Sequence, residues 1–298
     1  MLRKNFICLF AIIAIPAIIF SMTLISCRAG ASAQEQKTAG EVSEAAESDE
    51  SDTGKLATQP EETAPPETMQ PENTALPEET SQTEETIVNG EVTFLTEDGV
   101  ELKGNIFGQG KKWVILLHMY PTDQTSWFEF AEELAGKGYV ALTFDFRGYG
   151  NSGGDKDDIG NIDKDILASI DFIKQNYRYE KIFLLGASMG GTASIVAASA
   201  AKDESITGVI TLAAPDNMGD LMDALAVVSE LEIPKLFISA AGDDYHAESA
   251  KRLYDSAVEP KAIEIIKGSS EHGTFIFENE PQNAEKLKEI IFNFLNSN

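Results

Sequence analysis

A serine stands among glycines at one point of the chain, in the run Gly186-Ala187-Ser188-Met189-Gly190-Gly191. The run follows the apolar segment 181–185 and opens a stretch of small residues, 190–201, that is typical of a helix. A sharp turn from strand to helix has little room for side chains, which explains the glycines, and it projects the serine hydroxyl above the sheet. The helix N-terminus then favours the negative charge of the reacting centre. The pattern predicts a nucleophilic serine; a turn of small residues that only packs is the alternative.

A nucleophilic serine needs a base, and the chain has three histidines, His118, His246 and His272. His272 lies in a polar loop after the last apolar segment and before the C-terminal amphipathic stretch. In an open parallel sheet the reactive loops follow the carboxyl ends of the strands, so His272 is the predicted base. A surface histidine beside Glu271 is the alternative interpretation.

The base in turn needs a carboxylate that orients its ring. Asp243 and Asp244 follow the apolar segment 236–239, and Asp216 follows the apolar segment before it. By position alone, both Asp243 and Asp244 can serve as this carboxylate.

Alternating strand and helix patterns surround these residues. A hairpin signal at 96–99 joins segments 91–95 and 101–107. Continuous apolar runs, typical of strands buried on both faces, follow at 113–117, 140–146, 181–185, 206–213, 236–239 and 262–266. Amphipathic stretches lie at 126–137, 162–177, 190–201, 218–229, 247–257 and 283–296. The alternation predicts an α/β fold: a doubly wound, mostly parallel sheet of about eight strands with helices on both faces.

Residues 91–298 resemble the α/β-hydrolase superfamily of serine hydrolases, whose triad has the chain order serine, aspartate, histidine. The run Asp145-Phe146-Arg147-Gly148-Tyr149-Gly150-Asn151-Ser152 is similar to the family's turn D-x-R-G-x-G-x-S. The segment from Ser239 to Asp243 aligns with the family's H-G-x-x-D. The resemblance implies Asp243 as the acid, with Asp244 second and Asp216 a third position that some members use.

The resemblance also implies an oxyanion hole of two backbone N–H groups. Met189, directly after the serine, supplies one, and the loop after His118 supplies the other. The family usually has His-Gly-x in this loop; here Met119 replaces the glycine, and Tyr120 is the expected donor. We expect His118 to anchor the loop, and Arg147 to order its own turn without contacting a substrate.

Composition excludes several classes of function. The 298 residues carry a formal net charge of −26, which disfavours contact with phosphate backbones, so nucleic acid is not an expected partner. The only cysteines are Cys8 and Cys27, both in or beside the apolar leader, so the globular part has no disulfide and no thiolate nucleophile. Asp243, Asp244 and His246 are weak evidence for a metal site. The triad chemistry requires neither a metal nor an organic cofactor.

The start of the chain resembles a bacterial lipoprotein signal peptide. Two basic residues precede the apolar run 6–20, and Leu24-Ile25-Ser26-Cys27 resembles a lipobox. We expect residues 1–26 to be the signal peptide and Cys27 to carry a lipid that anchors the protein to the cell membrane, facing outside the cytoplasm. An uncleaved membrane helix is the alternative, because segment 6–25 is long enough to span a bilayer.

Between leader and domain, the chain is rich in Glu, Thr, Pro, Ala and Ser. Such a segment buries too little apolar surface to fold, so residues 27–88 are expected to be the anchor cysteine and a disordered acidic linker. Residues 89–298 then form the hydrolase domain.

The segment 214–235 has room for a helix but not for the cap domain of many relatives, which favours an open site. The predicted function is hydrolysis of small or exposed acyl esters by Ser188, His272 and Asp243. The same triad serves thioesterases and peptidases of the cell envelope, and the fold does not choose among them. A non-catalytic surface-binding lipoprotein is the alternative of another class.

Overall fold

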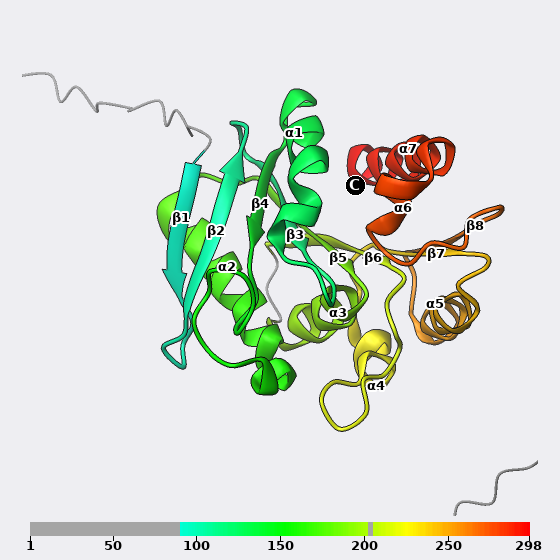
Figure 1. The fold of residues 1–298 in the computed structure, drawn as a ribbon, viewed down its shortest axis with the longest axis horizontal. Helices are drawn as coiled ribbons and strands as arrows, with labels where there is room; N and C mark the ends of the chain where they lie inside the picture. The colour runs from blue at the N-terminus through cyan, green and yellow to red at the C-terminus, as the bar shows by residue number, and fades with distance from the viewer. Residues whose placement is uncertain (1–89, 202–204) are drawn as a thin grey trace, which may run out of the picture. The chain divides into compact units, whose positions relative to one another are not determined.

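The structure is a computed structural model that describes residues 90–201 and 205–298 (Figure 1). The expected signal peptide, the lipid site at Cys27 and the acidic linker lie outside these residues. Within the two described ranges, none of the helices is long and apolar enough to cross a membrane.

An eight-stranded sheet forms the centre of the fold. Its strands are β1 (Gly90–Leu95), β2 (Glu101–Phe107), β3 (Lys112–Leu117), β4 (Val140–Phe144), β5 (Lys181–Ala187), β6 (Ile206–Leu212), β7 (Lys235–Ala240) and β8 (Lys261–Ile266). Their order is β1-β2-β4-β3-β5-β6-β7-β8. The pairs β1–β2 and β2–β4 are antiparallel, and the other five pairs are parallel. The predicted doubly wound, mostly parallel sheet is confirmed.

Helices cover both faces of the sheet, as Figure 1 shows. One face carries α1 (Phe128–Gly136), α6 (Phe275–Asn279) and α7 (Pro281–Ser297), and the other carries α2 (Ile162–Asn176), α3 (Met189–Ala201), α4 (Ala224–Val227) and α5 (Asp244–Ser256). Side chains alternate along each strand, so Leu116 and Leu185 of β3 and β5 pack under α1 and α7, whereas Leu117 and Leu184 pack under α2 and α3. Over residues 90–201 and 205–298, short 3₁₀ helices complete the elements: η1 (Gln124–Trp127), η2 (Lys156–Asn161) and η3 (Val228–Glu230).

The helix expected at 218–229 is wrong for most of its length, because α4 begins only at Ala224. Gly219 has a φ of 67°, outside the helical region, and Asn217 forms an isolated bridge with Asp223. The Asp223 side chain then accepts a hydrogen bond from Ala226 N–H and starts the helix there. The segment 213–234 is thus mostly loop, and among the described residues it contains only α4 and η3.

The expectation that every apolar run is buried on both faces is wrong for β8. This strand ends the order of the sheet and its residues alternate in exposure, with Ala262 and Glu264 exposed. An edge strand with one face toward solvent needs no continuous apolar sequence. The helix α6 was not expected from the sequence, because five residues are too few to show a helical period.

Candidate active site

Ser188 occupies a strained turn between β5 and α3. Its φ of 46° is in the left-handed region, which non-glycine residues rarely adopt. Hydrogen bonds hold the turn: Ser188 N–H donates to Leu212 O at 2.9 Å, and Gly191 N–H donates to Ser188 O at 2.9 Å. The side chain is half-buried at the carboxyl edge of the sheet. A strained backbone that neighbouring strands fix in place is typical of a functional serine.

Glycines surround Ser188 because other chain segments approach them closely. A Cβ on Gly186 would lie 2.3 Å from Gly190 O. A Cβ on Gly190 would lie 2.6 Å from Leu117 O and 2.7 Å from His118 O, so the loop after β3 lies directly against the start of α3. The reason given for these glycines from the sequence is therefore confirmed.

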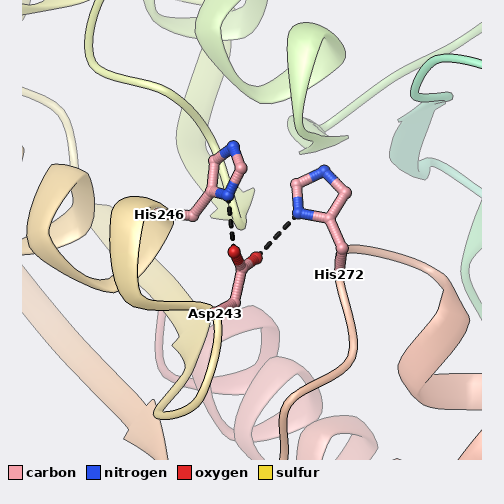
Figure 2. A group of neighbouring side chains, drawn as sticks. All are labelled: Asp243, His246 and His272. Carbon is pink, nitrogen blue, oxygen red and sulfur yellow. Dashed lines mark hydrogen bonds and ion pairs between the residues drawn. The ribbon is translucent and has the colours of Figure 1, made fainter. Parts of the chain in front are cut away.

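Asp243 and His272 meet in the structure, although 28 residues separate them in the sequence (Figure 2). Asp243 lies between β7 and α5, and His272 lies in the loop between β8 and α6. His272 Nδ1 donates to Asp243 Oδ2 at 2.7 Å. Because a carboxylate is an acceptor only, this bond fixes the proton on Nδ1 and leaves Nε2 of His272 free to accept another.

The loop that carries His272 lies against the strand that carries Ser188. A Cβ on Gly273 would lie 3.6 Å from the Cβ of Ala187, so the residue after His272 is next to the residue before Ser188. The β7–α5 loop joins the same assembly, since Gly242 N–H donates to Ser269 O at 2.9 Å. Ser188, Asp243 and His272 therefore lie in neighbouring loops at one edge of the sheet. Among the described residues, the Ser188 hydroxyl has no hydrogen-bond partner.

Met119, which replaces the expected glycine of the oxyanion loop, fits because of a glycine elsewhere. Its side chain is fully buried, and a Cβ on Gly273 would lie 2.4 Å from its Sδ. Gly273, with a φ of 56°, thus leaves the space that Met119 fills. Tyr120 follows with a side chain that is 65% exposed, and Met189 lies at the first position of α3, where a backbone N–H has no acceptor within the helix.

His118 is a structural residue of this loop. Its Nε2 accepts from Phe146 N–H at 3.0 Å, so Nδ1 carries the proton and donates to Met119 O at 3.1 Å. Burial lowers the pKa of His118 and keeps the ring neutral. Both ring nitrogens are engaged, which leaves none to act as a base.

The two other candidate carboxylates lie away from His272. Asp216 is buried against α5, where Arg252 Nε lies 2.6 Å from Asp216 Oδ2 and Ser249 Oγ donates to Asp216 Oδ1 at 3.0 Å. This ion pair lowers the pKa of Asp216. Asp244 is exposed at the first residue of α5. Of the three aspartates considered from the sequence, only Asp243 contacts His272.

A second histidine, which the sequence did not assign to the site, also contacts Asp243. His246 Nδ1 donates to Asp243 Oδ1 at 2.7 Å, and the ring centroids of His246 and His272 are 4.3 Å apart. The signal in the sequence is the spacing Asp-x-x-His at the start of a helix, which brings the two side chains to one face.

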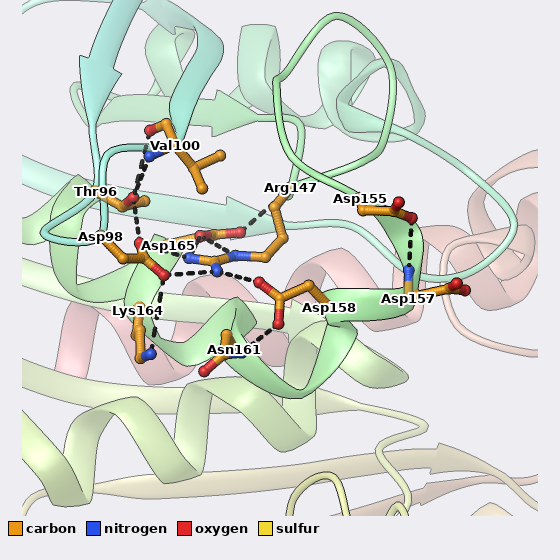
Figure 3. Close-up of polar contacts among 10 residues, drawn as sticks. All are labelled: Thr96, Asp98, Val100, Arg147, Asp155, Asp157, Asp158, Asn161, Lys164 and Asp165. Atoms are coloured by element: carbon orange, nitrogen blue, oxygen red, sulfur yellow. Dashed lines mark hydrogen bonds and ion pairs between the residues drawn. The ribbon is translucent and has the colours of Figure 1, made fainter. Parts of the chain in front are cut away.

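Arg147 lies outside the site and holds three carboxylates together (Figure 3). Its side chain is fully buried and pairs with Asp98 at 2.9 Å, Asp158 at 2.7 Å and Asp165 at 2.7 Å. Hydrogen bonds from Arg147 hold the pKa of Asp98 well below its usual range, while burial raises the pKa of Asp165 to about 6. Arg147 thus ties the β1–β2 hairpin to α2 and η2 and orders the turn after β4.

We expect Arg147→Met to lower the free energy of unfolding by about 3–5 kcal/mol, because it leaves a buried carboxylate without its partner. Denaturant unfolding at pH 7 measures the change. The matched control is Lys164→Met, which removes an exposed cation 3.8 Å from Asp98 and should cost no more than about 1 kcal/mol. Equal losses in the two variants would contradict the structural role of Arg147.

Comparison with known proteins agrees with this architecture. The family model described as alpha/beta hydrolase fold matches residues 112–231, which include β3 to β6 and the Ser188 turn. The chain has the α/β-hydrolase fold. The segment between β6 and β7, where some members of this fold insert a cap, is here the short loop with α4 and η3.

Several solved structures share the α/β-hydrolase fold with this chain. An esterase from Pyrococcus furiosus superposes with a TM-score of 0.61 at 22% identity, covering 70% of this chain and 91% of that one. A monoacylglycerol lipase from Paleococcus ferrophilus has a TM-score of 0.56 at 20% identity, covering 66% of this chain and 98% of that one.

Among curated proteins, a monkeypox virus protein named as a monoglyceride lipase homolog is 40% identical over 73 residues. The match covers 24% of this chain and 26% of that protein, so the chain spans about a quarter of the length of this relative.

Proposed function

We propose that the protein is a serine hydrolase that cleaves carboxylic esters with Ser188, His272 and Asp243. The observation that carries this proposal is the His272–Asp243 hydrogen bond of 2.7 Å in a loop that packs beside the strained Ser188 turn. A nucleophile, a base and an orienting carboxylate in neighbouring loops are what acyl transfer requires.

The reaction proceeds in two halves. Ser188 Oγ attacks the carbonyl carbon while Nε2 of His272 takes its proton, and the Asp243 carboxylate stabilises the resulting imidazolium through Nδ1. His272 then gives the proton to the leaving alcohol, and the acyl group remains on Ser188. A water molecule, deprotonated by His272, attacks the acyl-enzyme. The bond from the acyl carbon to Ser188 Oγ then breaks, His272 returns the proton to Oγ, and the acid is released. No step requires a metal or an organic cofactor.

The backbone N–H groups of Met189 and Tyr120 are proposed to bind the oxyanion. They come from two segments in contact, because Gly190 lies against Leu117 and His118. Each such donor is worth on the order of 10²–10³ in kcat when aimed at the developing charge.

The substrate class rests on the open site and on the relatives. The short loop 213–234 leaves the site without a cap in the described part of the chain, and Tyr120 and Tyr245 are exposed beside it. Esterases, a monoacylglycerol lipase and a monoglyceride lipase homolog are among the proteins similar to this chain. Both features favour small or exposed acyl esters over the amide and thioester substrates that the same triad can cleave.

A fluorophosphonate probe tests the proposal directly. It should label the full chain at Ser188 and should not label Ser188→Ala, and the labelled protein should no longer hydrolyse p-nitrophenyl esters of short acyl chains. A protein that takes no label and cleaves no ester, thioester or amide is not a hydrolase, and the fold then serves as a binding scaffold.

The proposed location is the outer side of a bacterial membrane, with a lipid on Cys27 and the acidic segment up to residue 88 as the tether. The support is the lipobox-like sequence Leu24-Ile25-Ser26-Cys27. We expect Cys27→Ala to abolish metabolic labelling with palmitate and to leave an uncleaved precursor of higher mass. Cys8→Ala is the matched control and should be labelled as the natural protein is. Labelling that persists in Cys27→Ala contradicts the anchor.

A further inference from the structure

His246 is the part of the site that the proposed hydrolysis does not use. The Asp243 carboxylate accepts from His272 with Oδ2 and from His246 with Oδ1, each at 2.7 Å. The side chains of His246 and His272 are 21% and 27% exposed, so solvent reaches both rings. A serine hydrolase needs one imidazole on its orienting carboxylate, and this protein has two.

The second imidazole creates the geometry of a metal site. Histidines that bind metals through one ring nitrogen almost always donate the other N–H to a carboxylate, which fixes the tautomer and the ring orientation. The Asp243 carboxylate accepts the Nδ1–H of both rings at once and so fixes the tautomer of each. Figure 2 shows the second nitrogen of each ring on the side away from Asp243, so each ring keeps an Nε2 lone pair for another partner.

The three side chains also form one compact cluster. One ligand atom from each of Asp243, His246 and His272 lies within 4.8 Å of the others. Two imidazoles on one Zn²⁺ ion, each at about 2.0–2.1 Å, have nitrogens about 3.3 Å apart. The ring centroids of His246 and His272 are already 4.3 Å apart, so rotations of the two side chains can bring their Nε2 atoms to one ion. Imidazole ligands suit Zn²⁺, whereas Mg²⁺ and Ca²⁺ prefer oxygen ligands. The net charge of −26 favours the approach of a cation.

We infer that His246 and His272, both held by Asp243, bind a Zn²⁺ ion that switches off the proposed hydrolysis. The switch rests on the proposed function, because Nε2 of His272 is the atom that takes the proton from Ser188. An ion bound to that lone pair leaves no base, and its release restores the base. The ion is therefore a reversible inhibitor and not a cofactor of the reaction.

The first test measures Zn²⁺ binding without reference to activity. The full chain, freed of metal with EDTA and transferred to EDTA-free buffer, is titrated with Zn²⁺ by calorimetry. His246→Asn keeps an amide donor for Asp243 but has no Nε2, so it should bind Zn²⁺ at least tenfold more weakly, as should His272→Asn. Asp244→Asn is the matched control: it removes the adjacent exposed carboxylate and should bind as the natural protein does. Any contribution from Cys8 and Cys27 is common to all four proteins.

The second test measures inhibition. Zn²⁺ should lower ester hydrolysis at least tenfold, EDTA should restore it, and Mg²⁺ or Ca²⁺ should have no effect. His246→Asn, compared with its own zinc-free rate, should need at least tenfold more Zn²⁺ for half-inhibition. Equal Zn²⁺ affinity, or equal half-inhibition, in His246→Asn and the natural protein would overturn the inference.

The two tests separate this inference from the proposed function. Hydrolysis that Zn²⁺ does not inhibit overturns the switch and leaves the hydrolase intact. Zn²⁺ binding that depends on His246, in a protein that cleaves no ester, supports the metal site but overturns the hydrolase and, with it, the switch.

Discussion

Ser188→Ala and His272→Ala are each expected to remove nearly all ester hydrolysis, lowering kcat by factors on the order of 10³–10⁶. The serine supplies the nucleophile and the histidine supplies its base, so neither works without the other. The double variant should therefore be scarcely slower than either single variant. Initial rates with a p-nitrophenyl ester, at equal amounts of folded protein, measure the three losses.

The fold should survive Ser188→Ala, because Ser188 is half-buried and, within the described residues, its hydroxyl makes no hydrogen bond. It should also survive His272→Ala, because His272 is partly exposed and Asp243 keeps its bond from His246. Ser199→Ala is the matched control. It removes a hydroxyl that donates to Glu230 at 3.2 Å, about three helical turns along α3 from Ser188, and should keep the natural rate. A Ser188→Ala protein that retains a tenth of the activity would place the nucleophile elsewhere.

The strands could be predicted from the sequence because the sheet is buried between two helical layers, which selects long apolar runs. The runs at 113–117 and 181–185 fall inside β3 and β5 for this reason. The prediction of a helix at 218–229 was wrong for most of that segment. Its apolar residues are spaced as in a helix, but Gly219 and the Asn217–Asp223 bridge hold most of it in a loop. Turn geometry within the segment overrode the helical spacing there.

The residues of the candidate site differ in how far the sequence locates them. Ser188 has a local signature, since its glycines are required by the turn itself. The choice among Asp243, Asp244 and Asp216 depends on distances across the sheet edge, and the structure puts only Asp243 against His272. The fit of Met119 against Gly273 is a contact between distant parts of the chain, and it could not be predicted from the sequence. The bond from His246 to Asp243 depends on side-chain orientation, which the sequence also does not give.

Asp243→Asn is expected to lower kcat by a factor on the order of 10⁴, because the amide can hold His272 in the wrong tautomer and cannot stabilise the imidazolium. Asp244→Asn should change kcat less than about twofold, since its exposed side chain does not contact His272. Asp216→Asn weakens the pairing with Arg252 and should affect stability more than kcat. KM should change little in Asp243→Asn, because Asp243 acts through His272 and not on the substrate. Hydrolysis rates of the three variants across pH 5–9 rank their losses of kcat. A larger loss in Asp244→Asn than in Asp243→Asn would assign the orienting role to Asp244.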